Sequence, residues 1–168
     1  MLELVIGGAR SGKSAYAEHC AQNSELAVHY IATATAGDAE MRQRITFHKK
    51  SRPNNWQTTE EPVHLGKALT AHSDVFVIVD CLTLWMTNIL ALEPEQYEKE
   101  ISHFFSSIEN ITTPIIFVTN EIGMGVVPLG EETRRFIDET GRLHQRLAKR
   151  CQRVTQMIAG IENRIKDE

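Results

Sequence analysis

The stretch GGARSGKS at residues 7–14 follows the short apolar run Leu2 to Ile6. It matches the complete pattern G-x-x-x-x-G-K-[ST] of a phosphate-binding loop. Glycines let such a loop turn its backbone amides toward phosphate oxygens, and the helix that follows adds its positive N-terminal end. The stretch therefore predicts a buried strand, a phosphate-binding loop and a helix in direct succession.

This loop predicts a site for the phosphates of a nucleoside triphosphate. Lys13 is expected to place its charge near the outer phosphates, and the Ser14 hydroxyl is suited to coordinating Mg²⁺. A glycine-rich turn without a ligand is the alternative, and the strand and helix on either side argue against it. The predicted phosphate-binding residues are Gly7, Gly8, Ala9, Arg10, Ser11, Gly12, Lys13 and Ser14.

Apolar runs and helical patterns alternate along the rest of the chain. Runs typical of buried strands lie at 27–31, 75–79 and 115–118, and a last strand is expected at 154–161. Helices are expected at 14–23, from Asp38 to the turn at 52–55, from Pro94 to about Ile108, and at 131–150. This alternation predicts a single α/β domain over 1–168, with a mostly parallel sheet covered by helices on both faces.

Acidic side chains near the strand ends are candidates for the same site. Ligands of such sheets lie beyond the carboxyl ends of the strands, so the loops that follow the strands should converge. Asp80 ends the run 75–79 and is the expected second support for Mg²⁺, with a helix or turn cap as the alternative. Glu60 and Glu61 are expected in a turn, where they could instead be solvated charges.

Composition narrows the classes of function. The chain has 168 residues and a formal net charge of -4, so no overall basic field favours nucleic acid. Three scattered cysteines without a CxxC pair argue against a disulfide framework or a zinc site and favour a reduced, cytoplasmic protein. No apolar run approaches membrane-spanning length, and we expect no signal peptide and no stable membrane insertion.

His48 lies among several cations, a setting that by itself is more often structural than catalytic. The ordered set of motifs around it is more specific. The set comprises Gly7–Ser14, Tyr30-Ile31-Ala32-Thr33-Ala34, Arg44-Ile45 with His48, Arg52-Pro53 and Trp56, Thr58-Thr59-Glu60, Asp80-Cys81-Leu82-Thr83 with Asn88, 119–128, and Gly141-Arg142. Over nearly the whole chain it resembles the bifunctional adenosylcobinamide kinase / adenosylcobinamide-phosphate guanylyltransferase family of cobalamin assembly, the CobU/CobP family.

The resemblance implies the P-loop NTPase (RecA-like) three-layer sandwich and two reactions. ATP or GTP would donate its γ-phosphoryl group to adenosylcobinamide, and GTP would then donate GMP to adenosylcobinamide phosphate. In this family a histidine carries the GMP between the steps, and His48 is the matching position because a basic residue and then Arg52-Pro53 follow it. Lys13 would act with it in catalysis, and Mg²⁺ would be the cofactor. The resemblance also implies a homo-oligomer, a trimer.

The resemblance extends the nucleotide site beyond the phosphate loop. The added residues are Ala32, Thr33, Ala34, Lys49, Lys50, Ser51, Arg52, Glu60 and Asp80. The turn 119–121 either faces the same cleft or shapes the glycine-containing loop that follows it.

Other functions fit the residues less well. A phosphate-loop kinase without guanylyl transfer requires a structural role for His48. A regulatory GTPase commonly carries an N-K-x-D segment, which this chain matches only at Asn120. A nucleic-acid motor is disfavoured because the chain is short and acidic and shows no surface of interleaved basic and aromatic residues.

Overall fold

The computed structural model describes residues 1–71 and 74–168, and in the helix Ala39–Ser51 it describes the backbone alone at Met41, Arg44, Phe47, His48, Lys50 and Ser51. One seven-stranded sheet runs through the described chain in the order β3-β2-β4-β5-β1-β6-β7. Its strands are β1 (Leu2–Gly7), β2 (Ala27–Ala32), β3 (Gln57–Glu60), β4 (Val75–Asp80), β5 (Ile115–Asn120), β6 (Arg153–Ile158) and β7 (Ile161–Asp167). All neighbouring pairs are parallel except β6 and β7. The predicted mostly parallel sheet is confirmed.

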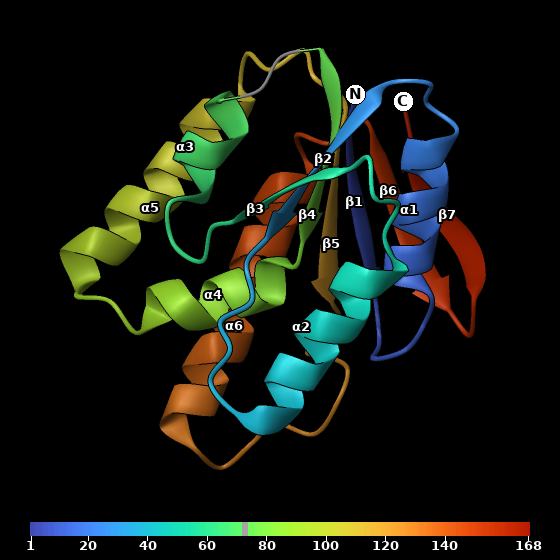
Figure 1. Cartoon of the computed structure of the whole chain (residues 1–168). Coiled ribbons are helices and arrows are strands. Elements are labelled where there is room, and N and C mark those ends of the chain that lie inside the picture. Colours follow the sequence, from blue (N-terminus) through green and yellow to red (C-terminus); the bar gives the residue numbers. More distant parts are fainter. Residues whose placement is uncertain (72–73) are drawn as a thin grey trace.

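Helices cover both faces of the sheet, as predicted (Figure 1). The helices are α1 (Lys13–Gln22), α2 (Ala39–Ser51), α3 (Leu65–Thr70), α4 (Leu82–Leu90), α5 (Pro94–Ile108) and α6 (Glu131–Ala148). α1 packs on one face, and α3 to α6 pack on the other. α2 lies across the carboxyl edge of the sheet, beside the loop that joins β1 to α1.

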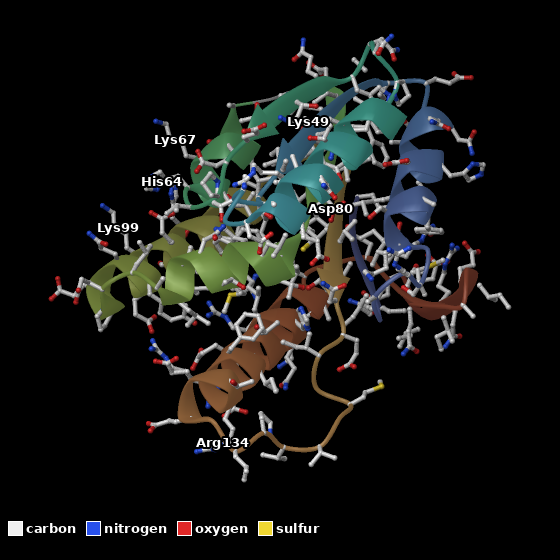
Figure 2. All side chains as sticks on the ribbon, turned by 60° about the horizontal axis from the view of Figure 1, so that its bottom comes forward. Lys49, His64, Lys67, Asp80, Lys99 and Arg134 are labelled. Atoms are coloured by element: carbon white, nitrogen blue, oxygen red, sulfur yellow. The ribbon has the colours of Figure 1, made fainter. Side chains whose placement is uncertain are left out.

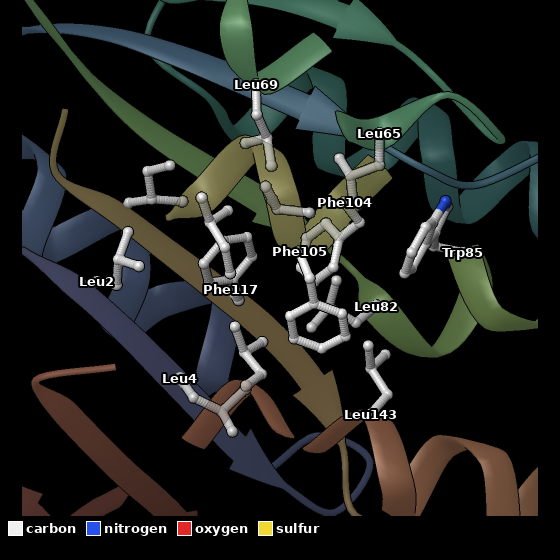
Figure 3. Packing of buried hydrophobic residues seen from close by; sticks show 14 of the residues in the cluster. Leu2, Leu4, Leu65, Leu69, Leu82, Trp85, Phe104, Phe105, Phe117 and Leu143 are labelled. Carbon is white, nitrogen blue, oxygen red and sulfur yellow. The ribbon is translucent and has the colours of Figure 1, made fainter. Parts of the chain in front are cut away.

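Strand alternation divides the core into two layers. The larger layer joins residues such as Leu4 and Phe117 to the helices α3 to α6. Phe104 of α5 is its centre, with ring centroids 5.0 Å from Trp85 and 5.6 Å from Phe117. Figure 3 shows these rings gathered between the sheet and the helices. The smaller layer joins the opposite strand face to α1. The sheet is thus held rigidly from both sides, which sets the positions of its carboxyl ends.

Two strand predictions were wrong. Residues 154–161 form two strands, because Ala159 and Gly160 both have positive φ and make the tight turn of the antiparallel hairpin β6–β7. Glu60 ends the short polar strand β3 instead of lying in a turn. β3 forms because its backbone pairs with β2, and its polar sequence gives no sign of this pairing. Within the described residues, no helix is both long enough and apolar enough to span a bilayer.

Candidate active site

The phosphate loop connects β1 to α1 and needs glycine at two positions. A Cβ on Gly7 would lie 2.4 Å from the backbone oxygen of Met157, its partner in the β1–β6 register. Gly12 has φ of 98° and occupies the N-cap position of α1, and a Cβ there would lie 3.2 Å from the Cα of Gly160. Side chains would therefore force the loop out of its conformation. The β6–β7 hairpin supports the loop from outside.

Lys13 spans the loop from the first turn of α1. Its Nζ donates hydrogen bonds to the Gly8 carbonyl at 2.6 Å and to the Ser11 Oγ at 3.4 Å. Burial lowers the pKa of Lys13, while the Asp80 carboxylate opposes this effect. A phosphate group beside Nζ would add a second negative charge and favour the ammonium form.

Asp80 is held at the end of β4 by two hydroxyl groups. The Ser14 Oγ donates a hydrogen bond to Asp80 Oδ2 at 3.1 Å, and the Tyr30 hydroxyl donates one to the same oxygen at 2.5 Å. Burial and the nearby carboxylate raise the pKa of Tyr30, so its hydroxyl remains a donor. Asp80 does not cap the following helix, because Cys81 occupies the N-cap position of α4 without a side-chain cap. Its carboxylate instead accepts the hydrogen bond from Ser14, the last residue of the phosphate-loop motif.

A cavity of about 680 Å³ opens at this edge of the sheet, a volume within the range of small-molecule sites. It is bordered by the loops after β1, β2, β4 and β5, the convergence expected from the sheet. Figure 2 looks toward this edge, with Asp80 near the centre and Lys49 on α2 beside it. Among the residues predicted for the site, those lining the cavity are Ala9, Arg10, Ser11, Gly12, Lys13, Ser14, Ala32, Ala34, Lys49, Arg52, Glu60 and Asp80.

Among the fully described predicted residues, Gly7, Gly8 and Thr33 do not line this cavity. Gly7 and Gly8 shape the loop behind it. Thr33 is buried, and its Oγ1 donates to the Cys81 carbonyl at 2.7 Å and accepts from the Cys81 amide at 2.9 Å. Thr33 thus links the loop after β2 to the loop after β4 by hydrogen bonds. The side chains of His48, Lys50 and Ser51 lie outside the described residues, while their backbone belongs to α2.

Two cationic residues at the C-terminal end of α2, Lys49 and Arg52, line the cavity. Lys49 forms an ion pair with Glu60, which β3 places in register with Ala32. The Arg52 guanidinium lies 3.4 Å from the centroid of the Tyr30 ring. Its Nε and Nη1 are buried and have no hydrogen-bond partner among the described residues. Two buried donors on a cation favour an anionic ligand at this wall.

The segment 119–121, of which the first two residues end β5, serves both of its expected roles. Asn120 lines the cavity. The Glu121 carboxylate instead accepts hydrogen bonds from the Gly123 amide at 2.6 Å and the Met124 amide at 3.3 Å, which shapes the next loop. From the sequence, Tyr30 is recognised only as part of a motif, and its place in the site is not predicted. Its contact with Asp80 depends on the register of β2 against β4 and has no local signal.

Comparison with known proteins places this geometry in a family. The family model described as cobinamide kinase / cobinamide phosphate guanyltransferase matches residues 3–165. The chain belongs to this family. A bifunctional adenosylcobalamin biosynthesis protein, CobP, from Pseudomonas aeruginosa is 48% identical over 100% of this chain and 99% of its own length. The relative CobU from Salmonella typhimurium is 38% identical, over 99% of this chain and 100% of its own length.

Solved structures support the fold of this family member. The flagellar accessory protein FlaH from Methanocaldococcus jannaschii has a TM-score of 0.53 and 13% identity, covering 99% of this chain and 78% of its own. The RadB recombinase has a TM-score of 0.51 and 15% identity, covering 92% of this chain and 73% of its own. These likenesses concern the fold alone, and they agree with the predicted α/β architecture around a mostly parallel sheet.

Proposed function

We propose that the chain phosphorylates adenosylcobinamide with ATP or GTP and then transfers GMP from GTP to adenosylcobinamide phosphate. The observation that carries this proposal is the full-length match to the family and to relatives named as bifunctional. The site supports it, because one cavity joins a phosphate loop to the cationic end of α2. A kinase without guanylyl transfer would leave the bifunctional naming of the relatives unexplained.

The phosphate loop and Asp80 serve the kinase step. Backbone amides of the loop and the Lys13 ammonium bind the outer phosphates and offset the charge on the transferred group. The Ser14 hydroxyl and the Asp80 carboxylate are joined by a hydrogen bond of 3.1 Å, and both supply oxygen ligands of the kind that suits Mg²⁺. We propose that these two residues hold it, and when bound Mg²⁺ would neutralise phosphate charge and orient the reacting group.

His48 serves the transferase step in this proposal. An imidazole nitrogen attacks the α-phosphorus of GTP, so that a P–N bond forms and the bond to pyrophosphate breaks. A phosphate oxygen of adenosylcobinamide phosphate then attacks the same phosphorus, the P–N bond breaks, and adenosyl-GDP-cobinamide is released. Lys49 and Arg52 follow position 48 in the sequence and line the cavity, which supports this role. Their charges offset those of the phosphates.

Labelling with GTP tests this proposal. Protein incubated with α-labelled GTP should retain label after denaturation, and γ-labelled GTP should leave none on the protein. His48→Ala should lose the covalent label and keep phosphorylation of adenosylcobinamide. His103→Ala, which changes an exposed histidine on α5, should keep both. Label retained by His48→Ala would remove His48 from this role, and no label on the wild type during active phosphorylation would refute the transferase half.

The quaternary structure and location are further parts of the proposal. We propose a homo-oligomer, a trimer as the resemblance implies, with no nucleic-acid partner. Light scattering of the purified protein tests the trimer, and a mass of one 19.0 kDa chain would contradict it. The three free cysteines support a reduced, cytoplasmic location.

A further inference from the structure

Tyr30 touches two parts of the cavity that are far apart in sequence. Its hydroxyl donates to Asp80 Oδ2 at 2.5 Å, and its ring carries the Arg52 guanidinium 3.4 Å from the centroid. Tyr30 is 1% exposed and still lines the cavity, so it forms part of the floor. A residue held in the core therefore contacts both a carboxylate beside the phosphate loop and a cation that follows α2.

Sheet register explains why Tyr30 reaches Asp80. Tyr30 lies opposite Ile78 in the β2–β4 pair, and Asp80 lies two residues further along β4. Residues two apart on a strand point to the same face, and a long aromatic side chain can reach such a diagonal neighbour. Arg52 follows the end of α2 at Ser51, and its guanidinium lies over the same ring, 3.4 Å from the centroid.

Both contacts restrict groups that a nucleotide would meet. Ser14 and Tyr30 both donate to Oδ2 of Asp80, and no described residue donates to Oδ1. The carboxylate is thereby fixed in orientation with one oxygen left for a ligand. The Arg52 guanidinium is held against the ring, and its Nε and Nη1 have no hydrogen-bond partner among the described residues. The acceptor and the donors are thus aligned before any ligand arrives.

We propose that Tyr30 is a positioning residue that sets the Asp80 carboxylate with its hydroxyl and the Arg52 guanidinium with its ring. The hydroxyl serves binding at the phosphate loop. The ring serves the α2 end of the cavity, where GMP transfer takes place. The second assignment rests on the proposed function, whereas the first concerns nucleotide binding alone.

Two substitutions separate these roles. Tyr30→Phe removes the hydroxyl and keeps the ring, so the Kd for GTP with Mg²⁺ should rise about tenfold, the effect of losing a hydrogen bond to a charged group. Its rate of guanylyl-enzyme formation at saturating GTP should stay within about twofold of the wild type. Tyr30→Leu also removes the ring, so its rate of guanylyl-enzyme formation at saturating GTP should be about tenfold lower than that of Tyr30→Phe.

Tyr97→Phe is the matched control. Tyr97 is also buried, and its hydroxyl donates to the Glu139 carboxylate at 2.9 Å, between α5 and α6. Tyr97→Phe should lower the thermal midpoint about as much as Tyr30→Phe does, and it should leave the Kd for GTP unchanged. Calorimetry measures the Kd, and rapid quenching with α-labelled GTP measures the rate.

Two outcomes would overturn the assignment. A Kd for Tyr30→Phe equal to that of Tyr97→Phe would show that the hydroxyl does nothing specific for binding. Equal saturating rates for Tyr30→Phe and Tyr30→Leu would show the same for the ring. If the wild type forms no guanylyl-enzyme, the proposed transferase function fails, and the calorimetric comparison still decides the role of the hydroxyl.

Discussion

Replacing His144 with glutamine should remove a loss of stability that the wild type suffers in mild acid. His144 lies on α6, and its Nε2 is 2.8 Å from the Oγ1 of Thr119 on β5. Burial lowers the pKa of His144 from 6.5 to about 4, with weak opposition from the Glu121 carboxylate. Glutamine offers a hydrogen-bonding nitrogen at a similar reach without a titrating ring.

The sign follows from proton binding. Between pH 6.5 and about 4, His144 is protonated in the unfolded chain and stays neutral in the folded chain. Stability therefore falls as the pH drops through this window and is unaffected above it. Within this window the free energy of unfolding falls by about 1.4 kcal/mol for each pH unit. Relative to neutral pH, it is therefore lower by about 1.4 kcal/mol at pH 5.5 and by about 3 kcal/mol at pH 4.

Urea unfolding at pH 7.5 and pH 5.5 measures this effect. The free energy of unfolding of His144→Gln, relative to the wild type, should improve by about 1.4 kcal/mol between the two pH values. His103→Gln, an exposed substitution on α5, is the control and should follow the wild type. If the wild type and His144→Gln lose equal stability between these pH values, the fold does not hold His144 neutral.

Further predictions concern packing and binding. Gly66→Ala should destabilise the protein by about 1–3 kcal/mol, because a Cβ would lie 2.9 Å from the His103 carbonyl oxygen. At Gly141 in α6 an added Cβ would meet nothing within 4 Å, so Gly141→Ala should stabilise the protein by about 0.5–1 kcal/mol. Urea unfolding measures both variants, and midpoints that move in the same direction for Gly66→Ala and Gly141→Ala would contradict this contrast. Phe104→Ala should cost about 3–5 kcal/mol in the same assay, and a cost below about 1 kcal/mol would argue against its central position in the core. Lys13→Met should weaken GTP binding at least about tenfold by calorimetry with a nearly unchanged thermal midpoint, and wild-type affinity would exclude Lys13 from phosphate binding.

Edge strands and a largely buried helix were missed by sequence reasoning. β3 and β7 lie at the two edges of the sheet, where polar residues are tolerated, so neither carries the apolar run that revealed the central strands. α4 is buried on most sides, so the polar stripe that marks a surface helix is missing. These elements exist because of their neighbours.

Local sequence was sufficient for the phosphate loop, the central parallel strands and the place of Asp80. Each depends on short-range chemistry: glycines before a helix, continuous apolar runs, and a polar residue at a strand end. The role of Tyr30 depends on which residue of β4 lies diagonally across from it. The low pKa of His144 depends on burial against β5. Strand register and burial are set by contacts between segments far apart in sequence, so only the tertiary structure decides them.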